Sequence, residues 1–253
     1  MRAHGAFETD SLWVRRAARS RPALRLICLP YGGGGASVYH SLAGLLPDTI
    51  EVVALQLPGR EDRSGEPPPV NLRRLVHTGS IALGPYCALP YAFYGHCAGA
   101  LLAFELAHEI NARFGTWPRH FIAAAQHAPH LPSTSVLLRP LPDDELLDTV
   151  RRRGGLPEAV ARNAELTEFL LPLLRSDFQL WRQYGHQPRK PMLCPITALR
   201  GVDDDIADAP AVRAWQEHTS ADFAFLEVEG GHYFANDMPA DTARLIADRL
   251  ARG

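Results

Sequence analysis

The 253-residue sequence has few cysteines, almost no net charge and no long apolar run. Its four cysteines are too few and too scattered for a disulfide scaffold, and the lack of any C-x-x-C pair argues against a zinc or redox site. A formal net charge of −2 creates no overall field that would attract nucleic acid or an anionic membrane. Residues 1–21 lack the apolar core of a signal peptide, and no stretch approaches the roughly 20 apolar residues of a membrane span. We therefore expect a cytoplasmic protein that binds neither nucleic acid nor membranes.

Short apolar runs alternate with longer helical patterns along the chain. A run that is almost continuously apolar, such as residues 50–57 (IEVVALQL), is typical of a strand covered on both faces. Alternation of such strands with helices predicts a single α/β domain over residues 1–253, with a mostly parallel central sheet and helices on both faces. The expected strands are 24–29, 50–57, 91–94, 120–126, 196–200 and 222–228. The expected helices include 98–114, 210–218 and 239–251.

Residues from about 130 to 190 break this alternation. They contain helical patterns at 142–153 (PDDELLDTVRRR) and 164–184, and no convincing strand. A helical insertion between two core strands predicts a lid over a substrate site. The alternative is a helical excursion that gates nothing.

The segment YGHCAGA, residues 94–100, carries the strongest chemical signal. A strand that ends in G-x-nucleophile-x-G and leads into a helix is a nucleophile elbow, the mark of the α/β-hydrolase fold. The turn is so tight that side chains at Gly95 and Gly99 would collide with neighbouring elements. The strained turn projects Cys97 beyond the sheet at the positive end of the next helix, where the amide of Ala98 can donate to an oxyanion.

Cysteine at the centre of this elbow admits two interpretations. In the first, Cys97 is a working thiol nucleophile, which the helix N-terminus and a nearby imidazole activate. In the second, the site has lost or altered its activity, or a natural serine was replaced to trap an intermediate.

An elbow nucleophile needs an acid and then a histidine later in the chain. His232 fits the base, because EGGHYF places it in a glycine-containing loop just after the last expected strand. The acid lies in GVDDD, residues 201–205, after the preceding strand. The G-x-x-D spacing favours Asp204, and Asp203 is the alternative. His96 adjoins the nucleophile, but its side chain should point away, into the support of the elbow.

The loop after the first core strand reads PYGGGGAS, residues 30–37. Its glycines expose backbone amides and permit positive φ angles. A phosphate-binding loop is excluded by the lack of a following Gly-Lys-Ser/Thr and of the G-x-G-x-x-G spacing. We expect the amide of Tyr31 or Gly32 to be the second oxyanion donor, beside that of Ala98.

The sequence resembles the type II thioesterases that accompany polyketide synthases and nonribosomal peptide synthetases. The resemblance is carried by the elbow, the glycine-rich loop and EGGHYF, and also by LPGREDR at 57–63 and LPLLRSDFQL at 171–180. The resemblance spans roughly residues 26–234. It implies an α/β-hydrolase that removes acyl groups from the phosphopantetheine arm of acyl or peptidyl carrier proteins. It implies a Cys97–His232–Asp204 triad, no metal or organic cofactor, and a monomer.

Two departures from the family pattern bear on substrate and reaction. The family's usual elbow is Gly-His-Ser-Met-Gly, and this sequence has Cys97 and Ala98 in place of Ser and Met. Two alternatives therefore stay open: acyl transfer or cyclisation with an amine or alcohol acceptor, and a non-catalytic protein that binds carrier proteins. The segment QHAP, residues 126–129, replaces a run of small residues and arginine. We expect His127 to line the acyl pocket together with Phe178 and Trp181. Further candidates for the pocket are Leu170, Leu171, Leu173 and Leu174. The candidates for carrier contact are the arginines at 60, 63, 73, 74 and 151–153.

Overall fold

The computed structural model describes residues 6–132, 135, 138–156, 160 and 162–252. Eight strands form one sheet in the order β1-β2-β4-β3-β5-β6-β7-β8. All neighbours from β4 to β8 pair in parallel, whereas β1 and β2 are antiparallel additions at one edge. The strands are β1 (Glu8–Thr9), β2 (Val14–Ala17), β3 (Leu24–Leu29), β4 (Ile50–Leu55), β5 (Tyr91–His96), β6 (His120–Ala124), β7 (Ile196–Gly201) and β8 (Phe223–Val228).

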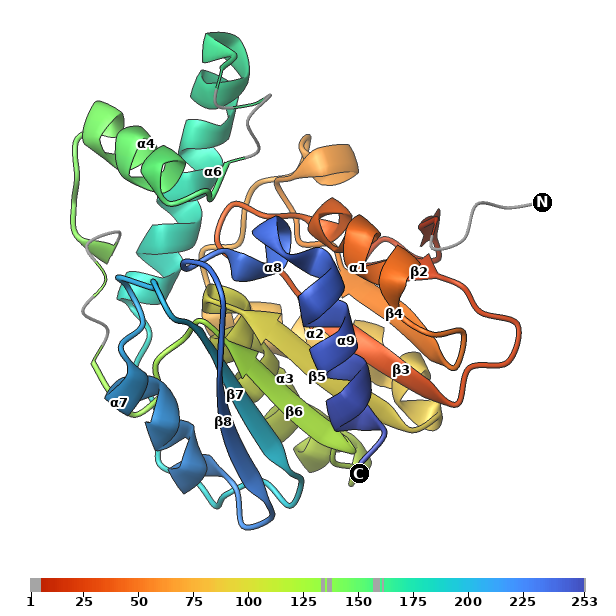
Figure 1. The fold of residues 1–253 in the computed structure, drawn as a ribbon. Helices are drawn as coiled ribbons and strands as arrows, with labels where there is room; N and C mark the ends of the chain where they lie inside the picture. The colour runs from red at the N-terminus through yellow and green to blue at the C-terminus, as the bar shows by residue number, and fades with distance from the viewer. Residues whose placement is uncertain (1–5, 133–134, 136–137, 157–159, 161, 253) are drawn as a thin grey trace.

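Helices cover both faces of the sheet (Figure 1). Helices α1 and α9 contact each other on one face, and α2 contacts α3 on the other. The helices are α1 (His40–Leu45), α2 (Leu72–Leu83), α3 (Ala98–Phe114), α4 (Asp143–Arg152), α6 (Ala164–Arg182), α7 (Ala209–Arg213), α8 (Phe234–Asp237) and α9 (Pro239–Leu250). Short 3-10 helices lie at Ala36–Tyr39, Glu61–Arg63, Gly84–Ala88 and Ala214–His218. Among the described helices, none is long and apolar enough to cross a membrane.

The strand sequences divide their side chains between two cores. In β3, Ile27 and Leu29 join the cluster under α2 and α3, whereas Leu26 and Cys28 join the cluster under α1 and α9. This alternation follows from the two-residue period of a strand, and because both faces are covered, the strand needs apolar residues at every position. The predicted parallel α/β sheet is confirmed.

The element bounds differ from the expected ones at several ends. Strand β5 continues to His96, two residues beyond the expected end, because the sheet bonds run up to the elbow. The helix expected at 210–218 is α only to Arg213 and then tightens into a 3-10 helix. The antiparallel edge strands β1 and β2 were not expected from the sequence. Strand β2 reads VRRA, and its Arg15 is held by Asp62 instead of facing solvent.

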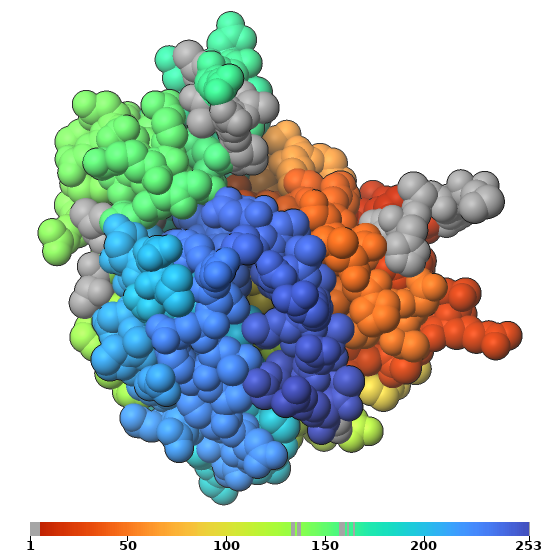
Figure 2. All heavy atoms as spheres, viewed as in Figure 1, coloured from red at the N-terminus to blue at the C-terminus, as the bar shows by residue number. Residues whose placement is uncertain are grey.

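In its described parts, the segment between β6 and β7 contains the helices α4 and α6 with irregular stretches around them. It rises from the carboxyl edge of the sheet, and its green and teal atoms project from the body of the molecule in Figure 2. Its own small core contains Leu146, Val150, Leu174 and Phe178. Helix α6 contains Pro172 in its interior.

Candidate active site

Cys97 occupies the tight turn between β5 and α3. Its backbone angles are φ 52° and ψ −126°, a conformation that costs a non-glycine residue energy and marks the elbow. Its amide donates to the carbonyl of Ala124 at 2.8 Å, which ties the turn to β6. A Cβ on Gly99 would lie 2.1 Å from the carbonyl oxygen of Leu29, and one on Gly95 would lie 2.5 Å from Cα of Ala100. Both glycines are therefore sterically required, as the elbow predicts.

His232 and Asp204 meet beside this elbow, on the loops after β8 and β7. Nδ1 of His232 lies 2.9 Å from Oδ2 and 3.0 Å from Oδ1 of Asp204, and both side chains are almost fully buried. Asp203 is exposed. Nε2 of His232 is buried and has no hydrogen-bond partner among the described residues. Of the two candidate acids, Asp204 is the one whose carboxylate holds the imidazole.

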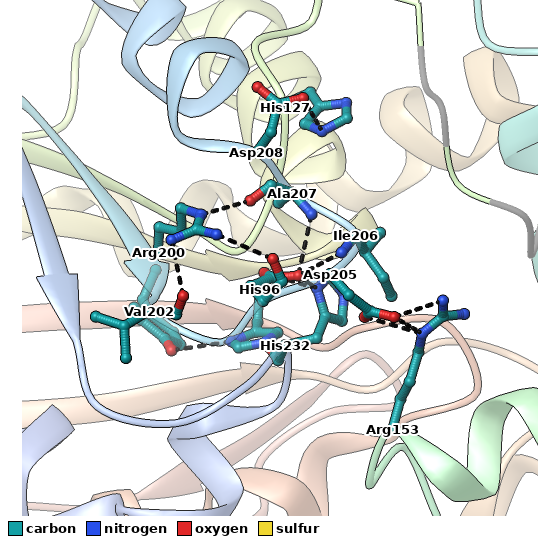
Figure 3. Close-up of polar contacts among 12 residues, drawn as sticks. His96, His127, Arg153, Arg200, Val202, Asp205, Ile206, Ala207, Asp208 and His232 are labelled. Atoms are coloured by element: carbon teal, nitrogen blue, oxygen red, sulfur yellow. Dashed lines mark hydrogen bonds and ion pairs between the residues drawn. The ribbon is translucent and has the colours of Figure 1, made fainter.

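The loop that carries Asp204 is held from several sides (Figure 3). Oδ1 of Asp204 accepts bonds from the amides of Ile206 and Ala207 at 2.8 and 3.0 Å. Arg200, at the end of β7, donates to the carbonyls of Asp204 and Ala207 at 3.0 and 2.8 Å. This role for Arg200 was not expected, since an arginine ending a strand gives no signal of which carbonyls it will reach.

The charges of the site favour an ionised pair. Burial alone would lower the pKa of His232, but the electrostatic interaction with Cys97 and the hydrogen bond to Asp204 outweigh it and raise that pKa to about 10. Burial likewise tends to raise the pKa of Asp204, and the hydrogen bond and charge of His232 reverse this and lower it. An imidazolium beside a carboxylate is the state that these interactions stabilise.

The His96 side chain contacts the backbone of the candidate base, His232, and so helps to support the elbow region. Its Nε2 lies 2.7 Å from the backbone carbonyl of His232, and its Nδ1 lies 3.3 Å from the hydroxyl of Tyr94. Burial, followed by the charge of His232, lowers the pKa of His96 to about 3, so the ring is neutral. A neutral ring with its proton on Nε2 satisfies both contacts.

The glycine-rich turn after β3 lies directly against the elbow. Tyr31, Gly32 and Ala98 line one small hollow. The amide of Gly33 donates to Asp177 at 2.7 Å and that of Gly34 to the carbonyl of Tyr31 at 2.9 Å. Within the described residues, no hydrogen bond is found from the amides of Tyr31 or Gly32, which keeps both as candidate oxyanion donors.

Of the four glycines in this turn, only Gly33 has a positive φ, at 82°. Gly35 is required for a different reason, because a Cβ there would lie 2.2 Å from Oε1 of Glu61. The expectation that the run serves positive φ angles is therefore correct at one position, and close packing accounts for Gly35.

A cavity of about 810 Å³ opens from the elbow toward the helical segment. Cys97 and Ala98 line it at one end, and the expected pocket residues His127, Phe178 and Trp181 all line it. His127 is buried, and its Nε2 lies 3.7 Å from Oδ2 of Asp208 (Figure 3). Of the six apolar α6 residues expected as candidates, Leu170, Leu171, Leu173 and Leu174 are not among the cavity-lining residues.

Two of the arginines expected as surface groups are buried. Arg60 is 3% exposed and bonds to Asp177, and Arg63 is 4% exposed and bonds to Glu66 and the carbonyl of Gln56. Neither can meet a partner protein. Arg73, Arg74, Arg151 and Arg152 are exposed. Among the described residues, no cluster of three or more His, Cys, Asp or Glu side chains has a geometry that could hold a metal ion.

Comparison with known sequences agrees with what the elbow, the histidine–aspartate pair and the cavity indicate. The sequence model of the thioesterase domain family matches residues 24–250. The chain belongs to the thioesterase family. It is accordingly a thioester hydrolase, and its sheet and helices have the α/β-hydrolase arrangement of the thioesterase structures that resemble it.

Three relatives of this thioesterase illustrate the match. The gramicidin S biosynthesis protein GrsT of Aneurinibacillus migulanus is 37% identical over 243 residues, which are 96% of this chain and 95% of that protein. The structure of RedJ, a thioesterase from the prodiginine biosynthetic pathway in Streptomyces coelicolor, has a TM-score of 0.83 and 35% identity over 91% of this chain and 90% of its own. The type II thioesterase BorB from the borrelidin biosynthetic cluster has a TM-score of 0.83 and 32% identity, with coverages of 96% and 97%.

Proposed function

We propose that this thioesterase hydrolyses acyl groups from the phosphopantetheine thiol of acyl or peptidyl carrier proteins in polyketide or nonribosomal peptide biosynthesis. The names of its relatives support the setting, because GrsT, RedJ and BorB are each named for a biosynthetic pathway or cluster. The observation that carries the chemistry is the buried pair of His232 and Asp204, 2.9 Å apart, beside the elbow of Cys97. Its free cysteines are consistent with action in the reducing cytoplasm.

The mechanism uses Cys97 as nucleophile, His232 as acid and base, and Asp204 to orient the imidazole. The thiolate attacks the thioester carbonyl, and the amides of Ala98 and of Tyr31 or Gly32 stabilise the oxyanion. As the tetrahedral intermediate collapses, the pantetheine sulfur leaves and takes the proton of the His232 imidazolium. His232, now neutral, removes a proton from water, which attacks the acyl-enzyme and releases the acid with Cys97 as thiolate.

The cavity next to Cys97 is the proposed acyl site. Phe178 and Trp181 from α6 supply apolar wall, and His127 supplies a polar group held beside Asp208. Because α6 forms part of this wall, we propose that the segment from about 130 to 190 acts as a lid within a single domain. Arg139 and Arg182 are exposed and also line the cavity, so they are suited to the phosphate of the pantetheine arm.

The test is an intact-mass experiment with an acylated carrier protein. Hydrolysis predicts a transient acyl adduct on the protein and stoichiometric release of the free acid. The variant Cys97→Ala should form no adduct and release no acid, whereas Cys87→Ala, at another half-buried free thiol, should behave as the unmodified chain.

The same experiment separates the alternatives. A persistent adduct without acid, discharged only by an added amine or alcohol, would replace hydrolysis by acyl transfer or cyclisation. Carrier binding without any adduct, unchanged in Cys97→Ala, would mean a non-catalytic carrier-binding protein.

A further inference from the structure

A buried ion pair joins α6 to the loop after β4. Nη2 and Nη1 of Arg60 lie 2.9 and 3.0 Å from Oδ1 and Oδ2 of Asp177, and the two side chains are 2% and 6% exposed. The two residues are 117 positions apart in the sequence. A bidentate pair of this kind fixes orientation as well as distance.

The same pair holds the glycine-rich turn at two points. Oδ2 of Asp177 accepts the amide proton of Gly33 at 2.7 Å, and Nη1 of Arg60 donates to the carbonyl of Gly34 at 3.0 Å. These are the residues that directly follow the candidate oxyanion donors Tyr31 and Gly32. The peptide planes of the turn are therefore oriented by one side chain from α6 and one from the loop after β4.

Helix α6 also packs directly on the turn. A Cβ on Gly33 would lie 2.5 Å from Cδ2 of Leu174, and one on Gly32 would lie 3.4 Å from Cε1 of Phe178. Gly33 has its positive φ at this contact. If α6 moved off the turn, Gly33 would lose both its hydrogen-bond acceptor and the side chain that packs against it.

We propose that Asp177 and Arg60 are positioning residues that set the oxyanion-binding turn, so that the turn is competent for catalysis only while α6 is seated on it. This inference rests on the proposed function of the turn. It assigns to the helical lid a part in transition-state stabilisation, in addition to forming a wall of the acyl cavity. Asp177 and Arg60 touch neither the reacting carbonyl nor Cys97 in this arrangement and act through Gly33 and Gly34.

The test compares two reactions of Cys97 in Asp177→Asn. Addition to a trifluoromethyl ketone analogue of the acyl thioester creates an oxyanion and needs the turn, whereas alkylation by iodoacetamide creates none. We expect the affinity for the ketone and the kcat for thioester hydrolysis to fall about 10- to 100-fold, because misaligned donors lose part of what deleted donors lose. The KM and the alkylation rate at Cys97, mapped by peptide mass, should stay within about twofold.

The matched control is Arg175→Ala. Arg175 lies two residues from Asp177 on α6 and pairs with Asp143 of α4, away from the turn. Arg175→Ala should leave the ketone affinity, the kcat, the KM and the alkylation rate unchanged. If Asp177→Asn does not fold, Arg60→Lys keeps the charge but removes the bidentate fork, and the same pattern is expected of it.

Equal losses of ketone affinity and alkylation in the folded variants would overturn the inference, because they would indicate general damage to the site. The inference would also be overturned if the ketone affinity and the kcat of Asp177→Asn or Arg60→Lys matched those of the unmodified chain. Failure of the unmodified chain itself to bind the ketone and release acid would instead refute the proposed function, so the two failures are distinguishable.

Discussion

His96 holds the backbone of His232, with its Nε2 2.7 Å from the carbonyl oxygen of that residue. The residue that precedes Cys97 in the chain thus supports the residue proposed as the base. His96 is buried, and its pKa of about 3 keeps the ring neutral around neutral pH, so this bond does not change with pH in that range. The elbow and the histidine loop are thereby fixed relative to each other.

Removing this support should weaken catalysis without abolishing it. In His96→Ala we expect kcat/KM for acyl release to fall about 2- to 10-fold, which corresponds to the loss of one hydrogen bond of roughly 0.5–1.5 kcal/mol. Steady-state hydrolysis of a soluble thioester measures the change. The exposed His77→Ala is the control, and an unchanged rate in His96→Ala would show that the histidine loop holds its place unaided.

The two neighbouring aspartates should differ sharply. Asp204→Asn should lower kcat by roughly 100- to 10,000-fold, because an amide no longer stabilises the imidazolium or selects its tautomer. Asp203→Asn should change kcat by less than about twofold, since Asp203 is exposed and makes no contact with the imidazole among the described residues. Single-turnover release from an acyl carrier measures both. Similar losses in the two variants would contradict the assignment of the acid.

The charge state of His232 should depend on Cys97. Because the folded protein raises the pKa of His232 to about 10, its imidazolium form is retained through neutral pH and lost as pH rises through that value. Replacing Cys97 by Ala removes the electrostatic interaction with Cys97 that favours the imidazolium, so the transition should move to lower pH. NMR titration of histidine labelled at Cε1 follows this, with His232→Gln to assign the signal. A transition at the same pH in both proteins would show that Cys97 does not influence the base.

Glycine 99 should tolerate no side chain. In Gly99→Ala the new Cβ would lie 2.1 Å from the carbonyl oxygen of Leu29, so α3 must move away from the loop after β3. We expect the free energy of unfolding to fall by about 1–3 kcal/mol or more. Urea denaturation measures it, with Gly65→Ala as the control because nothing lies within 4 Å of that position. A stable, active Gly99→Ala protein would contradict the tight elbow.

The sequence predicted those parts of the site that local patterns encode. The glycines around Cys97 report a steric requirement within one turn, and the G-x-x-D spacing located Asp204 on the correct loop. The ion pair of Arg60 and Asp177 could not be predicted in this way, because its partners come from distant segments and each residue alone reads as a surface charge. The edge strands β1 and β2 were missed for a related reason, since the carboxylate that holds Arg15 of β2 is Asp62, 47 positions away in the sequence.

Pro172 lies five residues before Asp177 and divides α6 into two halves. Proline has no amide proton, so the helix lacks the bond to the carbonyl of Glu168 and bends at low cost at this point. The first half carries the exposed side chains of Leu166 and Phe169, whereas the second is clamped by Arg60. A bend at Pro172 would therefore move the first half of α6 without breaking the contacts of Asp177 with Arg60 and Gly33.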